Sequence, residues 1–331
     1  MSVSSVNMFN YPVVLAFVAT VVAILALRPL LRAMGGGISD VSHTMRAYAP
    51  PVVGGIAAWC AVAVVWVHPL TSAGLPIELL GLLALRLVVP ANDNRRWGPW
   101  LVLGVDFLVC TAIVQQLDGS LQGYSAWMQV IFGVAILQGV YRLRDLDGLA
   151  AVTVGIGLMS LALVSVGTSL WLASCGAAAV AALLLFNLPA RINRVWRVQL
   201  GQGGGSVITL VFLIAGRMAL QDGDVAVIHL LWLLPIPCCE LVMLLGGCRK
   251  SGHQRLLESG FSVTAIFMLY ALVGVVPMLV LVLAEPSAEV TLLVLTALTA
   301  LWLLALHHAG RLMWLLPWQL RRIDVPPQPH G

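Results

Sequence analysis

This sequence has very little charge. Only 10% of its 331 residues are Asp, Glu, Lys or Arg, whereas 60% are hydrophobic. The mean hydropathy of +0.97 is far above that of soluble globular domains. The composition therefore excludes a soluble globular protein and predicts a polytopic membrane protein. The net charge of +4 is explained by membrane topology, so it gives no indication of nucleic-acid binding.

The sequence also lacks a cysteine pattern and a signal-peptide pattern. Its six cysteines have no spacing typical of a metal site or a disulfide framework, and we interpret them as apolar packing residues. No small-residue cleavage site follows the first apolar segment, so we expect this segment to remain as a membrane span. The cysteines are Cys60, Cys110, Cys175, Cys238, Cys239 and Cys248.

Apolar segments, by contrast, are abundant. A helix crosses a bilayer with roughly 20 apolar residues, and the sequence contains about eleven such segments. The predicted fold class is an all-α transmembrane bundle, with one domain over residues 1–310 and an interfacial amphipathic segment and disordered tail over 311–331. The third, fifth and eighth segments are short. The segments are 11–31, 51–69, 75–89, 99–116, 126–140, 149–167, 169–187, 206–220, 225–245, 261–285 and 288–308.

The basic residues predict how the chain is oriented. Of the 18 Lys and Arg residues, all but Arg86 and Arg217 lie in alternate connections, at their edges or in the C-terminal tail. The intervening connections carry only acidic residues or no charge. Because cytoplasmic loops are enriched in Lys and Arg, we expect the N-terminus outside and the C-terminus in the cytoplasm. All the polar, glycine-bearing loops then face the cytoplasm.

The most highly charged of these loops lies within residues 138–150. Arg142, Arg144, Asp145 and Asp147 place four charges in six residues. Such a concentration at a membrane face indicates a candidate site. It also fits an ordinary solvated turn between two spans.

Two further loops contain groups suited to phosphate. Gly201, Gly203, Gly204 and Gly205 precede a predicted span, and backbone N–H groups of a glycine-rich loop can bind a phosphate. The same composition fits a flexible connector. In the loop over 249–261, His253 and Arg255 are candidate phosphate partners, although a loop histidine also fits a solvated residue.

Taken in order and on one side, these loops resemble the polyprenyl-phosphate N-acetylhexosamine-1-phosphate transferase family. The resemblance implies transfer of a sugar-1-phosphate from a UDP-sugar to undecaprenyl phosphate, with Mg²⁺. The reaction would occur at the cytoplasmic face of the bacterial inner membrane, in O-antigen or exopolysaccharide synthesis. The matching pieces are Asp40 with 51–55, the loop 92–99, residues 147–150, residues 186–190 with the Gly201 loop, and residues 253–257.

The sequence departs from the family pattern at the positions that carry the chemistry. Asn92 and Asp93 stand where the family has an Asp-Asp pair, and Gln202 stands where it has an Asp. Because Mg²⁺ prefers carboxylate oxygens, the metal affinity is expected to fall. Arg96 and Arg144 lie where relatives carry acids, and guanidinium groups bind phosphate well. Further departures are Gln138 and Tyr141 for Asn or Asp, and a single His253 for paired histidines.

By this resemblance, the site residues divide into three groups. Asp93 and Asp147 are the expected catalytic acids, and Asp93 is the remaining metal ligand, with Asn92 and Gln202 at the degenerate ligand positions. The expected phosphate-binding residues are Arg46, Arg144, Gly201, Gly203, His253 and Arg255.

Two alternatives stay open. A catalytically silent homologue would bind the lipid carrier, or an active transferase of polysaccharide synthesis, as a scaffold or regulator. A transporter of a lipid-linked sugar would instead need a continuous polar path through Arg86, Asp106, Arg217 and Glu240.

Overall fold

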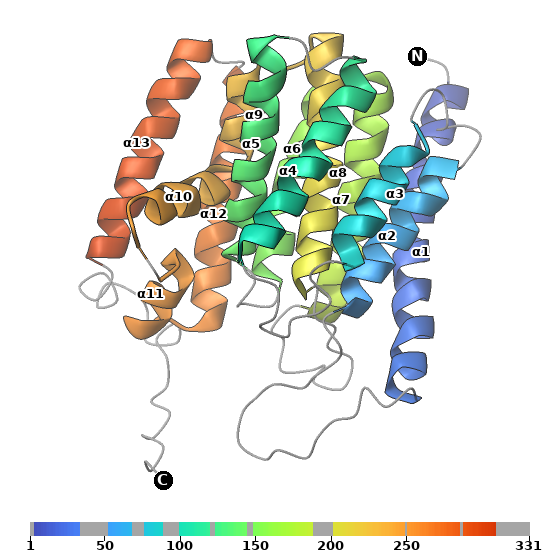
Figure 1. The fold of residues 1–331 in the computed structure, drawn as a ribbon, viewed down its shortest axis with the longest axis horizontal. Coiled ribbons are helices and arrows are strands. Elements are labelled where there is room, and N and C mark those ends of the chain that lie inside the picture. The colour runs from blue at the N-terminus through green and yellow to red at the C-terminus, as the bar shows by residue number, and fades with distance from the viewer. Residues whose placement is uncertain are drawn as a thin grey trace.

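The computed structural model describes residues 3–33, 52–67, 76–88, 99–119, 123–143, 148–187, 201–248, 250–284 and 287–308. Within these ranges every regular element is a helix (Figure 1). The helices are α1 (Val3–Ala33), α2 (Val52–Val67), α3 (Glu78–Val88), α4 (Pro99–Asp118), α5 (Tyr124–Tyr141), α6 (Leu149–Val164), α7 (Gly167–Asn187), α8 (Gly201–Asp222), α9 (Val227–Leu233), α10 (Pro235–Leu245), α11 (Gly252–Glu258), α12 (Val263–Ala284) and α13 (Ala288–His307).

The prediction of an all-α membrane bundle is confirmed for the described part of the chain. Six helices are long and apolar enough to cross a membrane, and α9 with α10 forms a seventh candidate if the bent pair is one span. Shorter apolar helices cover 11–27, 55–64 and 149–164. The predicted segments all contain helix, but the number of crossings and the orientation stay predictions.

The predicted ninth segment is not one continuous helix. It is divided into α9 and α10, whose axes differ by 90°. Leu234 lies between them with φ −127° and ψ 56°, and Pro235 and Pro237 follow. A proline disfavours helical backbone in the preceding residue and supplies no N–H to the helix. The break is fixed from the α9 side by the fully buried Trp232, whose Nε1 donates to the Pro277 carbonyl at 2.6 Å.

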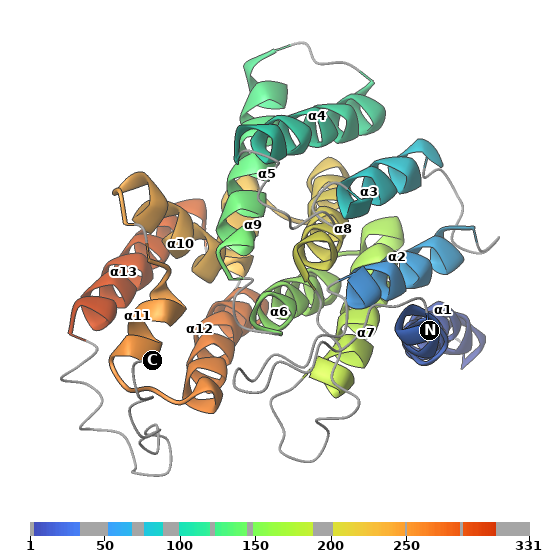
Figure 2. The same cartoon turned by 60° about the horizontal axis from the view of Figure 1, so that its bottom comes forward.

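The helices are arranged around α8. This helix packs on α2, α3, α5, α6 and α7, and it is the most buried of the six long apolar helices. Helices α1, α2 and α7 lie on one side of it, and α10, α12 and α13 lie on the other (Figures 1 and 2). Helix α8 is therefore the central helix of the described bundle.

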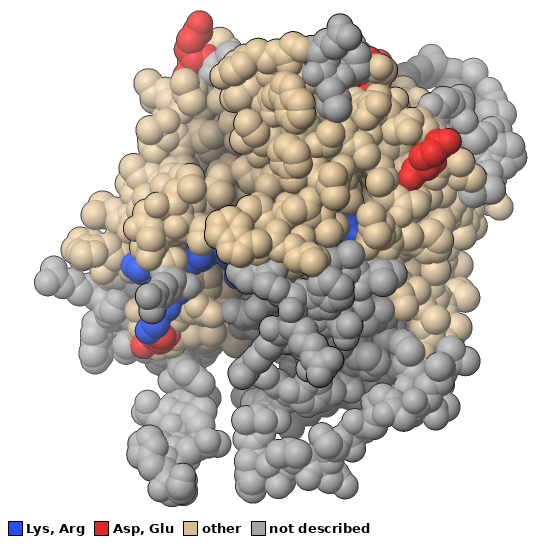
Figure 3. Space-filling model, in the orientation of Figure 1, with Lys and Arg blue, Asp and Glu red and all other residues tan. Residues whose placement is uncertain are grey.

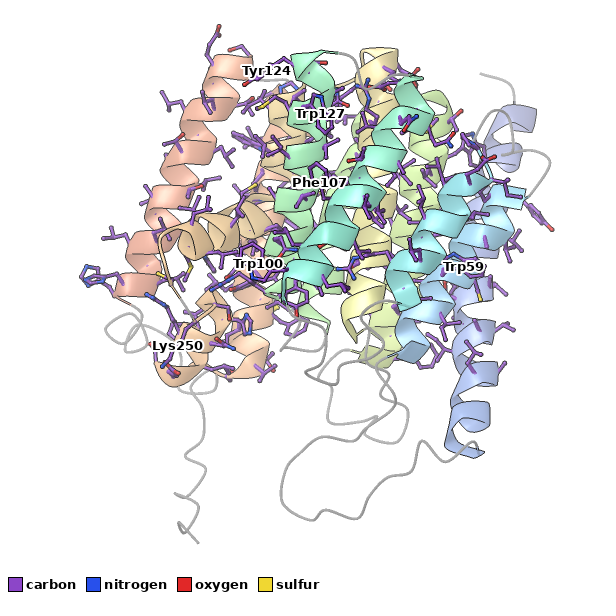
Figure 4. All side chains as sticks on the ribbon, viewed as in Figure 1. Trp59, Trp100, Phe107, Tyr124, Trp127 and Lys250 are labelled. Atoms are coloured by element: carbon purple, nitrogen blue, oxygen red, sulfur yellow. The ribbon has the colours of Figure 1, made fainter. Side chains whose placement is uncertain are left out.

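Two exposed aromatic residues mark opposite ends of the bundle. Trp100 on α4 and Tyr124 on α5 are both 81% exposed, and they lie toward the lower and upper ends (Figure 4). Tryptophan and tyrosine are enriched where a membrane meets water. Between them, Phe107 and Trp127 stack at 6.2 Å on the outer face of α4 and α5. This face suits contact with lipid.

Candidate functional site

The helix ends that flank the polar segments lie at one end of the bundle, the lower end in Figure 1. They are the C-terminal ends of α1, α3, α5 and α7, the N-terminal ends of α2, α4, α6 and α8, and helix α11. On the face shown in Figure 3, most described basic side chains gather toward this end, whereas most acidic side chains lie higher, with one beside the basic group. The arrangement agrees with a shared face for the polar segments.

The structure describes four of the eight predicted site residues. Gly201 and Gly203 belong to α8, and His253 and Arg255 belong to α11. The other four, together with the degenerate ligand position Asn92, lie outside the described residues. These four are Arg46, Asp93, Arg144 and Asp147.

The glycine-rich segment is not the loop that we expected. Helix α8 begins at Gly201, so Gly201 to Gly205 form its first turns, and we call these residues the glycine turn. A Cβ on Gly203 would lie 2.7 Å from the Leu87 carbonyl oxygen, and one on Gly55 would lie 2.8 Å from the Gly204 nitrogen. Glycine is a poor helix former. Here it allows α2, α3 and α8 to approach closely, as small residues do between membrane helices.

The glycine turn also meets the two helices that flank residues 144–147. A Cβ on Gly205 would contact Ala150 of α6 at 3.8 Å and Val140 of α5 at 3.9 Å. The first turns of α8 thus touch α2, α3, α5 and α6 near their ends. In the sequence, the segments 34–51, 89–98, 144–147 and 188–200 adjoin these helices. The candidate segments therefore start from one place in the bundle.

In the sequence, residues 144–147 lie between two buried leucines. Leu143 and Leu149 are both fully buried. Gly148, the N-cap of α6, has a φ of 82°, which glycine adopts far more readily than other residues.

One buried ionic cluster joins α3, α4 and α5. The Arg86 guanidinium pairs with the Asp106 carboxylate, and both side chains are 0% exposed. Gln138 Nε2 donates to Asp106 Oδ2 at 2.8 Å. The Arg86 nitrogens Nη1 and Nη2 have no hydrogen-bond partner among the described residues. The charge pair is therefore neutralised but incompletely hydrogen bonded.

A second ionic cluster joins α5, α10, α11 and α12. Arg142 donates from Nε to Glu240 Oε2 at 3.2 Å and from Nη2 to the Cys248 carbonyl at 3.1 Å. Glu240 Oε1 accepts from the Gly252 N–H at 2.8 Å and from the Tyr270 hydroxyl at 3.4 Å. From the sequence, we named Glu240 only as a charged residue of a possible transport path and did not predict its partners. Its position within an apolar segment was the signal that it needs a partner.

A third pair lies near the opposite end of α8. Arg217 Nε donates to Asp118 Oδ1 at 2.8 Å, and Gln221 Nε2 donates to the same oxygen at 3.0 Å. The four residues proposed for a transport path thus belong to three separate ion pairs. The prediction of a continuous polar path through them is wrong, because each charge is neutralised locally.

His253 and Arg255 differ in their surroundings. His253 is fully buried on α11, and its Nδ1 lies 3.0 Å from Ser251 Oγ. Ser251 precedes α11, and its backbone N–H donates to Gln254 Oε1 at 3.1 Å. Arg255 is partly exposed. A short helix in the loop over 249–261 thus presents one candidate residue inward and the other toward the surface.

The described residues do not fit a magnesium site. They include no group of three or more His, Cys, Asp or Glu side chains arranged to hold a metal ion. The two fully buried carboxylates, Asp106 and Glu240, are each paired with an arginine. The expected ligand Asp93 lies outside the described residues. We therefore propose no reaction step that requires a metal ion.

Comparison with known proteins adds no relative. No protein-family model matches the chain, and no curated protein matches it. The resemblance to the transferase family therefore stays a prediction.

Proposed function

We propose that this membrane protein is a divergent transferase that moves a sugar-1-phosphate from a UDP-sugar to undecaprenyl phosphate. The proposed place is the basic end of the bundle, in the bacterial inner membrane with this end in the cytoplasm. What supports the proposal is the convergence of the helices that flank the candidate segments on the glycine turn of α8. We expect the segments that these helices flank to meet one pair of substrates.

The reaction requires charge neutralisation above all. An oxygen of the lipid phosphate would attack the sugar-linked phosphorus of the UDP-sugar. A new P–O–P linkage would form, the original one would break, and UMP would leave. Two anionic substrates repel each other, and guanidinium groups are well suited to hold phosphates. We assign this role to Arg46, Arg144 and Arg255, with Asp93 and Asp147 as the catalytic acids.

The test is transfer of radiolabelled sugar phosphate from UDP-GlcNAc and related donors to undecaprenyl phosphate by purified protein, with and without Mg²⁺. Asp93→Asn should abolish product. The matched control Asp222→Asn changes an exposed acid at the other end of α8 and should leave the rate unchanged. If no donor gives product while an established family enzyme does so in the same assay, the transferase proposal is overturned.

A second candidate is a catalytically silent protein that binds the lipid carrier. Two observations favour it: His253 is buried against Ser251, and Gly203 is packed against Leu87. Both candidate groups therefore serve the fold. The purified protein would then bind undecaprenyl phosphate more tightly than undecaprenol and yield no transfer product. Equal binding of the two lipids would contradict this alternative.

A further inference from the structure

Glu240 contacts three other helical segments through one buried carboxylate. Its Oε2 receives the Arg142 Nε–H, and its Oε1 receives the Gly252 N–H and the Tyr270 hydroxyl. Arg142 is the C-cap of α5, Gly252 is the first residue of α11 and Tyr270 belongs to α12. The side chain is 0% exposed. One carboxylate thus holds the end of α5 and the start of α11 at a fixed separation.

The break at Leu234 makes this arrangement possible. The 90° bend turns α10 across the bundle (Figure 1). A Cβ on Gly139 of α5 would lie 2.3 Å from the Pro237 carbonyl oxygen, so α10 rests directly on α5. Glu240 follows Pro237 by one helical turn and reaches both Arg142 and Gly252.

Gly252 also lies too close to the Glu240 carboxylate to carry a side chain. A Cβ at this position would lie 2.8 Å from Glu240 Oε1 and 3.1 Å from the Tyr270 hydroxyl. Any larger residue would displace one of these oxygens from its present contact. Gly252 therefore donates a backbone hydrogen bond to the carboxylate and, having no side chain, leaves room for it.

We propose that Glu240 is a positioning residue that couples the C-terminal end of α5 to helix α11. Arg142 lies just before 144–147 in the chain, and Gly252 lies just before His253. In the sequence, both helix ends therefore adjoin candidate groups of the site, and Glu240 links the two ends directly. The catalytic consequence rests on the proposed transferase function, but the coupling itself does not.

A buried ion pair is a poor source of net stability, because desolvation offsets the attraction. An apolar contact between α5 and α10 would stabilise the bundle equally well. A carboxylate differs in that it accepts several hydrogen bonds at once from separate segments. This property is what a coupling role requires.

The coupling is tested by amide hydrogen exchange on the full chain in lipid nanodiscs. Glu240→Ala removes the acceptor for both segments, so exchange should become at least ten-fold faster in residues 139–143 and in residues 250–258. Glu240→Gln retains an acceptor for the Gly252 N–H but loses the charge that holds Arg142. Its effect should be larger in 139–143 than in 250–258.

The matched control is Glu258→Gln. Glu258 lies on α11 and pairs with Lys250, but the two side chains are 56% and 58% exposed, so exchange in both segments should stay unchanged. If Glu240→Ala speeds exchange in only one of the two segments, the coupling proposal is overturned.

A second variant guards against loss of the fold. Arg142→Met combined with Glu240→Leu replaces both charges by apolar groups of similar size, a change that buried ion pairs often tolerate. The Gly252 N–H still loses its acceptor, so residues 250–258 should again exchange at least ten-fold faster. Wild-type protection of this segment in the double variant would show that apolar packing alone holds α11, and it would overturn the proposal.

The catalytic consequence has its own readout. In the transfer assay, Glu240→Gln should lower kcat at least ten-fold and change KM for either substrate less than two-fold, because alignment and not binding is disturbed. An unchanged kcat would contradict the catalytic role. If the wild-type protein transfers nothing, the proposed function fails, whereas the exchange measurement still decides whether Glu240 couples the segments.

Discussion

Gly203 of α8 lies against the carbonyl of Leu87 on α3, so closely that a Cβ at this position would be 2.7 Å from the oxygen. The contact joins the N-terminal turn of α8 to the C-terminal turn of α3. Because the neighbour is backbone, it cannot move aside as a flexible side chain would. The separation of these two helices is therefore fixed by the absence of a side chain.

We expect Gly203→Ala to push α3 and α8 apart. The cost of such overpacking is about 1–3 kcal/mol in the free energy of unfolding. The matched control is Gly81→Ala on α3, where a Cβ would meet nothing within 4 Å and the better helix propensity of alanine should stabilise by up to about 1 kcal/mol. Thermal unfolding in detergent measures both. Equal melting temperatures for the two variants would refute the steric argument.

The Arg86–Asp106 pair should be sensitive to loss of one partner. Asp106→Asn leaves a fully buried guanidinium without its counter-charge, which costs about 3–5 kcal/mol. Replacing both residues, as Arg86→Met with Asp106→Leu, removes the uncompensated charge and should recover most of this loss. Chemical denaturation of the single and double variants gives the comparison. A double variant less stable than the single one would contradict the explanation.

The Arg217–Asp118 pair serves as a comparison at the other end of α8. Its side chains are 19% and 14% exposed, so water and lipid headgroups can solvate an unpaired charge better than at Arg86. Asp118→Asn should therefore destabilise less than Asp106→Asn, by about 1 kcal/mol or less. The same denaturation experiment compares the two variants, and an equal or larger loss of stability in Asp118→Asn would contradict the influence of burial.

The orientation of the chain is tested by labelling with a maleimide that does not cross membranes. A cysteine at Asp222 should react in intact spheroplasts, whereas one at Lys250 should react only after permeabilisation, because the basic loops are expected to face the cytoplasm. Labelling of the unsubstituted protein measures the background from the six native cysteines. The opposite pattern would invert the proposed topology and move the site outside the cell.

The helices were predictable because a run of about 20 apolar residues has few other structures available in a membrane. The start of α8 was not, since glycines at 201, 203, 204 and 205 favour a loop by propensity. Only contact with Leu87 and Gly55 shows why a helix forms there. Pro235 gave a reason to expect the break at Leu234. The prediction nevertheless treated 225–245 as one span because of its high hydropathy.

The polar residues between apolar runs predicted that the polar segments share one end of the bundle, and the flanking helix ends agree with this. The side-chain pairs within the bundle could not be predicted in the same way. The Arg142–Glu240 pair joins positions 98 residues apart, and sequence separation of that kind contains no local signal. Burial of His253 was equally hidden, because it depends on how α11 docks onto α12 and α13.

Leu143 and Leu149 are both buried and lie on either side of the charged segment 144–147. We therefore expect the length of this segment to be constrained. An inserted or deleted residue would have to be accommodated between these two buried positions. Diverged homologues should preserve the spacing of these leucines even where none of the charges survives.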